Sequence, residues 1–204
     1  MAARWNLLKG WALLTAVAAA AALLLQYALL LTGPAAAAGV AMATLRFCSY
    51  FTVLSNLAVC LSCVWIACGR HLPAPLAATL ALCIGVTGLV YGLVLQRLWH
   101  PTGLQWWADT GLHYATPVLY LLGWLWLLPH GALRWRVLGP ELMVPVAYLG
   151  WAMLCGTLTG QVPYPFLDLQ RIGAAAFSGN VLRVAGVFVL GWTALWALDR
   201  WRGR

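Results

Sequence analysis

The chain has 204 residues, of which 64% are hydrophobic and only 8% are charged. A water-soluble domain needs a far more polar surface, so this composition predicts an integral membrane protein. The formal net charge of +8 does not indicate a nucleic-acid partner, because the basic residues are scattered at segment ends and form no basic tract. Six spans of roughly 20 residues nearly exhaust the length and leave no room for a soluble domain.

Six apolar segments, separated by short charged or proline-containing stretches, follow one another along the chain. We expect a single all-α domain over residues 1–204 whose six transmembrane helices cover about 10–32, 40–68, 74–98, 108–128, 142–160 and 174–198. The first segment follows a basic start, as a signal peptide does. Its apolar run is about twice as long as the usual apolar core of a signal peptide, which favours a retained helix.

The basic residues are distributed unevenly between the two expected ends of this bundle. With a cytoplasmic N-terminus, the inner ends hold Arg4, Lys9, Arg70, Arg134, Arg136, Arg200, Arg202 and Arg204. The outer ends and outer halves hold Arg46, Arg97, Arg171 and Arg183. The positive-inside tendency and the even number of spans predict that both termini are cytoplasmic. The excess of arginine over lysine is typical of a GC-rich bacterium, so we expect the bacterial plasma membrane, which is the inner membrane.

Neither a metal nor a cofactor is expected. Cys60 and Cys63 form a CxxC pair, a spacing that also occurs in redox and metal sites. No second pair and no nearby histidine completes such a site, so both thiols are expected to pack as small apolar groups. No lysine lies within a span, which excludes a retinal Schiff base.

The second expected span carries a polar stripe in its first half. Its members are Ser49, Thr52, Ser55 and Asn56, whose spacing of three and four residues puts them on one helix face. A polar face within a membrane needs a polar partner. Thr52 lies roughly 9 Å along the helix beyond Arg46, and a histidine on the fourth span lies at a comparable depth.

That histidine is His113, which shares a helix face with Asp109 four residues earlier. Asp109 can orient the imidazole, or it can be an interfacial charge near the start of a helix. Pro117 cannot donate a hydrogen bond to the carbonyl of His113, so we expect the helix to kink there. Arg183, on the sixth span, needs either a protein partner such as Asp109 or a substrate carboxylate.

Each of these side chains also has a purely structural interpretation. A lone threonine in a spanning helix most often donates to a backbone carbonyl one turn earlier or to a neighbouring helix. A lone histidine can be a satisfied core residue. Only a dispersed group of residues remains as a candidate site, because no HExxH, GxSxG or phosphate-binding glycine loop is present.

Three blocks of the sequence stand out together: RFCSYFTVLSN at 46–56, DTGLHYATPVL at 109–119 and VPYPFLD at 162–168. These blocks resemble the androgen-induced and androgen-dependent membrane hydrolase family and its bacterial relatives. Their order and the six-span layout match that family over nearly the whole chain. The family's animal members are threonine hydrolases that cleave fatty acid esters of hydroxy fatty acids, with a threonine on an early span and a histidine on a middle span.

The resemblance implies that His113 is the catalytic histidine and Thr52 the nucleophile, although a slightly shifted pairing places Ser49 at the nucleophile position. The expected reaction is acyl transfer to Thr52 with His113 as general base, on a lipid ester held within the bilayer. We expect Asn56 and Asn180 to be candidate oxyanion donors. The candidate substrate-binding residues are Arg46, Arg97, Arg183 and Tyr164, with the arginines holding a lipid carboxylate.

Two other classes of function remain open. A small-solute or proton-linked transporter would also place Asp109, His113 and Arg183 inside a bundle, and it would have a water-accessible route to both faces. A non-catalytic lipid-binding protein would keep a pocket but leave Thr52 and His113 out of hydrogen-bonding reach. The distance between these two side chains therefore discriminates among the hypotheses.

Overall fold

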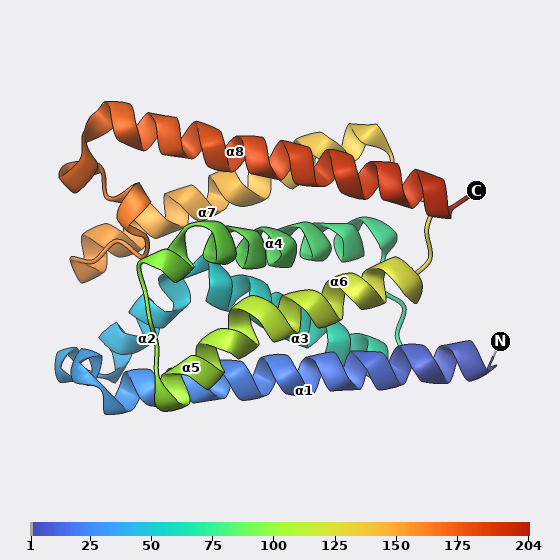
Figure 1. Cartoon of the computed structure of the whole chain (residues 1–204), viewed down its shortest axis with the longest axis horizontal. Coiled ribbons are helices and arrows are strands. Elements are labelled where there is room, and N and C mark those ends of the chain that lie inside the picture. Colours follow the sequence, from blue (N-terminus) through green and yellow to red (C-terminus); the bar gives the residue numbers. More distant parts are fainter. Residues whose placement is uncertain (1) are drawn as a thin grey trace.

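The computed structural model describes residues 2–204, which form a helical bundle (Figure 1). The α-helices are α1 (Ala2–Thr32), α2 (Val40–Ser49), α3 (Phe51–Ala67), α4 (Ala74–Leu93), α5 (Gly103–Thr110), α6 (Thr116–Trp126), α7 (Leu138–Thr159) and α8 (Leu169–Arg202). The short elements are the 3-10 turns η1 (Pro34–Ala38), η2 (Leu95–Arg97), η4 (Trp135–Val137) and η5 (Pro165–Leu167), and the π-helical turn η3 (Gly111–Ala115). Both termini lie at one end of the bundle, and α2 lies at the other (Figure 1).

Four helices are long and apolar enough to cross a membrane: Ala3–Thr32, Ala74–Arg97, Pro140–Thr159 and Leu169–Arg202. They correspond to the first, third, fifth and sixth expected spans, although the first, fifth and sixth extend beyond the expected boundaries. The sixth has an interruption at Gly173, whose φ of 77° is a left-handed conformation that glycine adopts without strain. The expectation of an all-helical protein with membrane-length helices is therefore confirmed.

The second expected span, 40–68, is not one straight helix. It bends by 84° between α2 and α3, where Tyr50 is extended, and it makes a fifth span only if the bent pair crosses as a unit. Side chains of α7 stabilise the break from outside. Trp151 Nε1 donates to the Cys48 carbonyl at 2.9 Å, and the Tyr148 hydroxyl donates to the Ser49 carbonyl at 2.9 Å. These contacts satisfy carbonyls that a continuous helix would bond internally.

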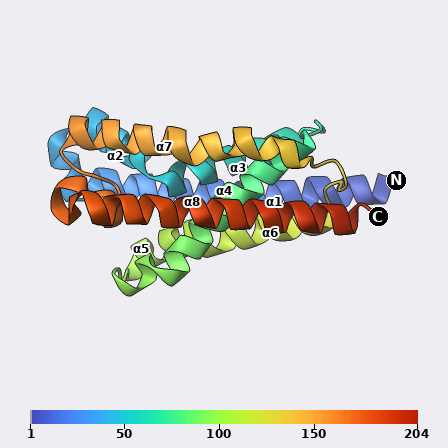
Figure 2. The same cartoon turned by 90° about the horizontal axis from the view of Figure 1, so that it is seen from above.

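The fourth expected span, 108–128, is divided among α5, η3 and α6. In η3 the N–H of Thr116 donates to the carbonyl of Gly111, five residues back, instead of four. Pro117 follows immediately and has no N–H to offer His113, so a wider turn at this point agrees with the expected irregularity. Figure 2 shows α5 leaving the side of the bundle.

Small side chains allow α1 to pack closely on α3. Ala12, Ala16 and Ala19 are at most 4% exposed and lie in the same apolar cluster as Val59 and Cys63. Close helix packing through small residues is the usual stabilising contact when both helices are apolar. Cys60 and Cys63 are free thiols buried in this core, and no group of three or more metal-ligating side chains occurs in the part of the chain that the structure describes.

Candidate active site

The break at Tyr50 places Thr52 in the first turn of α3, where backbone N–H groups have no partner within the helix. Two tyrosine hydroxyls act as the missing hydrogen-bond acceptors. The N–H of Phe51 donates to the Tyr148 hydroxyl at 3.2 Å, and the N–H of Thr52 donates to the Tyr164 hydroxyl at 3.3 Å. A tyrosine from α7 and one from the α7–α8 connection thereby hold the start of α3 and orient Thr52.

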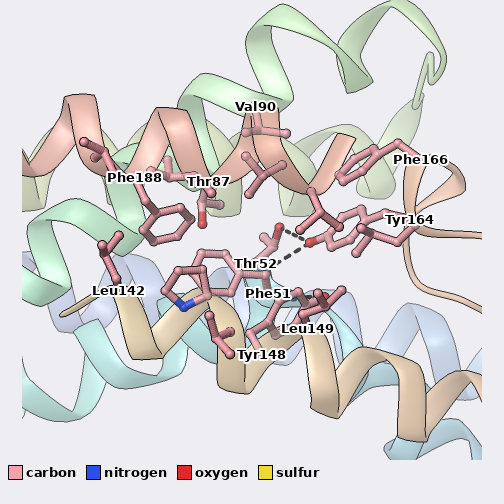
Figure 3. Close-up of a pocket in the computed structure, with 18 of the residues that line it drawn as sticks. Phe51, Thr52, Thr87, Val90, Leu142, Tyr148, Leu149, Tyr164, Phe166 and Phe188 are labelled. Atoms are coloured by element: carbon pink, nitrogen blue, oxygen red, sulfur yellow. Dashed lines mark hydrogen bonds between the residues drawn. The ribbon is translucent and has the colours of Figure 1, made fainter. Parts of the chain in front are cut away.

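The Thr52 hydroxyl lies between two side chains that are distant in sequence. Its Oγ1 is 3.3 Å from Nε2 of His113 and 3.3 Å from the hydroxyl of Tyr164. The second of these contacts is drawn in Figure 3. Thr52 is only 8% exposed, so water competes little for these hydrogen bonds. The partner expected for the polar stripe of the second span is therefore present.

The tautomer of His113 follows from its second hydrogen bond. Its Nδ1 lies 3.0 Å from the backbone carbonyl oxygen of Asp109, which can only accept. Nδ1 therefore carries the proton in the neutral ring, and Nε2 is the acceptor for the Thr52 hydroxyl. The Asp109 carboxylate is 3.4 Å from the same Nδ1, so it can stabilise the imidazolium that forms when Nε2 takes a proton.

Neighbouring helices fix the position of the imidazole. The ring of Tyr91, on α4, stacks on it with a centroid distance of 3.9 Å and an interplanar angle of 14°. Asn56 donates from its amide to the carbonyls of Thr52, at 2.8 Å, and Leu112, at 3.0 Å, and so joins α3 to the histidine turn. Tyr91 was not expected from the sequence, because a tyrosine in an apolar span gives no specific signal.

Two glycines let neighbouring helices approach the histidine turn. A Cβ atom on Gly111 would lie 2.6 Å from the Cβ of Ala22 on α1. A Cβ atom on Gly88, in α4, would lie 3.0 Å from the carbonyl oxygen of His113 and 3.3 Å from the Cβ of Pro117. The turn that carries His113 is therefore packed between α1 and α4 at close range.

Replacement of Gly88 by alanine is expected to destabilise the fold by about 1–3 kcal/mol, because the new methyl group crowds the backbone of the histidine turn. Thermal unfolding of the purified protein in detergent measures this effect. Gly92→Ala is the matched control on the same helix, since a Cβ there meets no atom within 4 Å and alanine is the better helix former. Equal losses of stability in both variants would contradict the close packing at Gly88.

The structure distinguishes the two candidate nucleophiles. Ser49 ends α2, on the other side of the break, and its hydroxyl donates to the carbonyl of Arg46 at 2.7 Å. In residues 2–204, the side-chain hydrogen bonds of His113 go to Thr52 and Asp109, and none goes to Ser49. The shared helix face expected for Ser49 and Thr52 is wrong because the helix breaks between them. Of the two hydroxyls, Thr52 is the one that contacts the imidazole, which is the arrangement that a hydroxyl nucleophile needs.

The two asparagines are placed differently from expectation. Both N–H groups of the Asn56 amide are used by backbone carbonyls, so Asn56 positions the site and has no free donor for an oxyanion. Asn180 donates to the carbonyl of Phe166 at 2.9 Å and ties η5 to α8. Tyr164, which was expected to bind substrate, does contact Thr52, and its hydroxyl lies 3.3 Å from Oγ1.

The three arginines expected to bind a lipid carboxylate do not gather around Thr52. Arg46 donates to the carbonyl of Thr159 at 3.2 Å, Arg183 donates to Asn180 at 2.8 Å, and Arg97 is exposed on η2. Arg183 therefore has a protein partner, which is Asn180 rather than Asp109. None of the three lines the cavity beside Thr52.

That cavity has a volume of about 270 Å³ and lies among α3, α4, α7, η5 and α8. Its walls are mostly apolar, and Figure 3 shows Val90, Leu142, Leu149, Phe166 and Phe188 around it. Thr52 and Tyr164 also line the cavity, whereas His113 does not. Because His113 contacts the Thr52 hydroxyl from outside the cavity, its ring takes up no cavity volume, and an apolar group can lie there.

Tyr164 lies in the α7–α8 connection, and burial raises the pKa of its phenol above the usual value. The phenol therefore stays protonated at neutral pH. Because its oxygen already accepts from the Thr52 N–H, its proton is available for Thr52 Oγ1 or for an oxygen bonded near it. The site thus contains a buried threonine hydroxyl, an imidazole acceptor and a neutral hydrogen-bond donor.

Comparisons of the chain with protein-family models, with curated proteins and with solved structures found no match.

Proposed function

We propose that this chain is a six-span intramembrane lipid ester hydrolase, with Thr52 as nucleophile and His113 as general base. The contact of 3.3 Å between Thr52 Oγ1 and His113 Nε2 carries the proposal. This distance is close to the hydrogen-bonding range of activated nucleophiles, which is often looser without substrate. The resemblance to the androgen-induced and androgen-dependent hydrolases points to the same two residues.

The membrane arrangement in this proposal has six crossings with both termini in the cytoplasm of a bacterium. The bent pair α2–α3 is one crossing, and the consecutive elements α5, η3 and α6 supply another. The position of both termini at one end of the bundle (Figure 1) supports an even number of crossings. The arginine-rich ends support the orientation.

The reaction begins when Thr52 Oγ1 attacks the carbonyl carbon of the ester and its proton passes to His113 Nε2. The carbonyl electron pair moves to the oxygen, where the Tyr164 hydroxyl donates a hydrogen bond to the negative charge. Collapse of this intermediate breaks the bond to the alcohol oxygen, which takes the proton from Nε2. The acyl group is then esterified to Thr52.

A water molecule completes the cycle. It attacks the acyl carbon while His113 Nε2 removes its proton, and the bond to Thr52 breaks as Oγ1 takes that proton back. The products are a free fatty acid and the restored threonine. The Asp109 carbonyl and carboxylate hold the imidazole in the required tautomer through both steps.

The cavity supports a lipid substrate of the class of fatty acid esters of hydroxy fatty acids or related esters. Its apolar walls suit an acyl chain, which then never has to enter water. The same walls disfavour a hydrated solute, as a transporter would carry. Since no arginine lines the cavity, the acyl chain and not a carboxylate is the part that it recognises in this proposal.

The test is hydrolysis of lipid esters by the purified protein in detergent micelles. We expect release of fatty acid from a long-chain ester of a hydroxy fatty acid, and much slower hydrolysis of the corresponding acetyl ester, because the acetyl group leaves the cavity empty. Hydrolysis no faster than in protein-free micelles for every long-chain ester would refute the proposed function.

A further inference from the structure

A second hollow, of about 760 Å³, lies at the end of the bundle that holds both termini, away from Thr52. The start of α1, the end of α3 with the turn that follows it, the turn that follows α6 and the end of α8 contribute to it. Nothing in the proposed reaction uses this hollow, so its chemistry needs an independent explanation.

Its polar lining is entirely basic. Arg4, Arg70 and Arg202, which are widely separated in the sequence, meet there together with His71 and His130. No aspartate or glutamate lines the hollow, and no arginine in residues 2–204 forms an ion pair with a carboxylate. The three arginines are exposed side chains at the edge of the hollow. Like charges at one hollow without an acid repel one another, and an anion bound there would relieve that repulsion.

The acid that contacts His130 already has hydrogen-bond partners of its own. The carboxylate of Asp199 accepts the N–H groups of Gly131 and Leu133, both at 2.9 Å, and its Oδ1 lies 3.4 Å from Nδ1 of His130. It is 1% exposed, so it faces the protein interior and not the hollow. The positive charge of the three arginines therefore remains available to a ligand.

Aromatic contacts help to hold two of the basic side chains of the hollow, Arg70 and His71, in place. The guanidinium of Arg70 lies over the ring of Trp65, 5.1 Å from its centroid, and His71 packs on Trp5 with centroids 5.0 Å apart. Cation–π contacts of this kind restrict a side chain without neutralising its charge. The guanidinium therefore keeps its ability to bind an anion.

The floor of the hollow is apolar. Leu8, Ile66 and Leu128 line it and are at most 8% exposed, and Leu72 and Leu127 complete the wall. A free phosphate ion would leave this surface unused. A molecule with a phosphate and an acyl chain matches both parts, since guanidinium groups bind phosphate by paired hydrogen bonds and the leucines pack on hydrocarbon.

We propose that this hollow binds an anionic glycerophospholipid, with its phosphate against Arg4, Arg70 and Arg202 and part of an acyl chain on the leucine-lined floor. The location at the ends of membrane-length helices puts the phosphate at the level of the lipid headgroups. The site is separate from the ester-cleaving site, and the lipid is a bound ligand and not a substrate.

Native mass spectrometry of the purified full chain in an uncharged detergent tests this proposal. Dioleoyl phosphatidylglycerol and dioleoyl phosphatidylcholine are titrated separately. We expect phosphatidylglycerol to bind more tightly, and the double variant Arg70→Gln/Arg202→Gln to weaken its binding roughly 20-fold, because each basic residue near a membrane contributes about a fivefold gain. Arg70→Lys/Arg202→Lys keeps both charges and should retain most of the affinity.

The matched control is Arg134→Gln/Arg136→Gln, which removes two exposed charges that do not line the hollow. We expect its affinity for phosphatidylglycerol to stay within about twofold of the unaltered protein, since neither side chain lines the hollow and salt screens exposed charges that do not contact the ligand. Thermal unfolding in detergent shows that each variant is folded. If Arg70→Gln/Arg202→Gln does not fold, the single variant Arg202→Gln replaces it. If the control pair does not fold, Arg134→Gln alone replaces that pair.

Three outcomes would overturn the proposal. One is equal affinity for the two lipids, and another is an equal loss in the two glutamine double variants, which would indicate a general charge effect. The third is displacement of the lipid by millimolar inorganic phosphate, which would identify the free anion as the occupant.

Discussion

Replacement of Thr52 by alanine is expected to lower kcat for lipid ester hydrolysis by at least about 10⁴-fold, the scale seen when a hydrolase loses its nucleophile. His113→Ala removes the proton acceptor and is expected to cost about 10²–10⁴-fold. The double variant should be little worse than Thr52→Ala alone, because the two residues act as a unit. Initial rates of fatty acid release at saturating substrate measure all three.

Ser49→Ala is the matched control for the nucleophile. Ser49 is as buried as Thr52 and also has a hydroxyl, but its hydrogen bond goes to the Arg46 carbonyl. We expect its kcat to stay within a few-fold of the unaltered protein, since it takes no part in the reaction. Loss of activity in Ser49→Ala with retention in Thr52→Ala would reverse the assignment.

The second large effect is expected from Tyr164→Phe, which removes one hydroxyl and keeps the ring. If this hydroxyl stabilises the oxyanion, kcat should fall about 10²–10³-fold while KM changes little, because the interaction is made in the transition state. Steady-state kinetics with one long-chain ester separate the two constants.

Tyr148→Phe is the control for the structural part of this effect. The Tyr148 hydroxyl supports the same helix break, because it accepts from the Phe51 N–H and donates to the Ser49 carbonyl, but no hydrogen bond joins it to Thr52 Oγ1. Tyr148→Phe and Tyr164→Phe should each lower the free energy of unfolding by about 1–3 kcal/mol. Equal losses of kcat in the two variants would show that Tyr164 acts only as a support for α3.

The helical architecture and the central pair of residues were accessible from the sequence. Apolar segments of spanning length predict helices because the backbone of a membrane segment must satisfy its own hydrogen bonds. Counting residues inward from the segment ends put Thr52 and His113 at similar depth, and the structure brings their side chains to 3.3 Å. Pro117 likewise indicated an irregular helix, which is the turn η3.

The break at Tyr50 was not accessible in the same way. No proline or glycine marks it, and the residues that stabilise it, Tyr148 and Tyr164, come from a distant part of the chain. The roles of the polar residues also depend on these long-range contacts. Asn56 and Asn180 were expected to be oxyanion donors, but their amides hold backbone carbonyls that only the folded chain brings near.

The arginines were difficult to assign for a related reason. A charge inside an apolar segment indicates that some partner exists, but it does not say which one. Arg46 and Arg183 donate to a backbone carbonyl and to an asparagine, and neither type of partner has a sequence signature. By contrast, the three arginines that line the second hollow come from three separate helix ends, so their common location became visible only in the bundle.

The most direct measurement for the central claim is the identity of the residue that becomes acylated. The purified protein is treated with a long-chain fluorophosphonate or an activated fatty ester, and the modified peptide is sequenced by mass spectrometry. We expect the added mass on Thr52, with labelling absent in Thr52→Ala, strongly reduced in His113→Ala and unchanged in Ser49→Ala. Labelling of Ser49, or undiminished labelling of the Thr52→Ala variant, would contradict the proposed nucleophile.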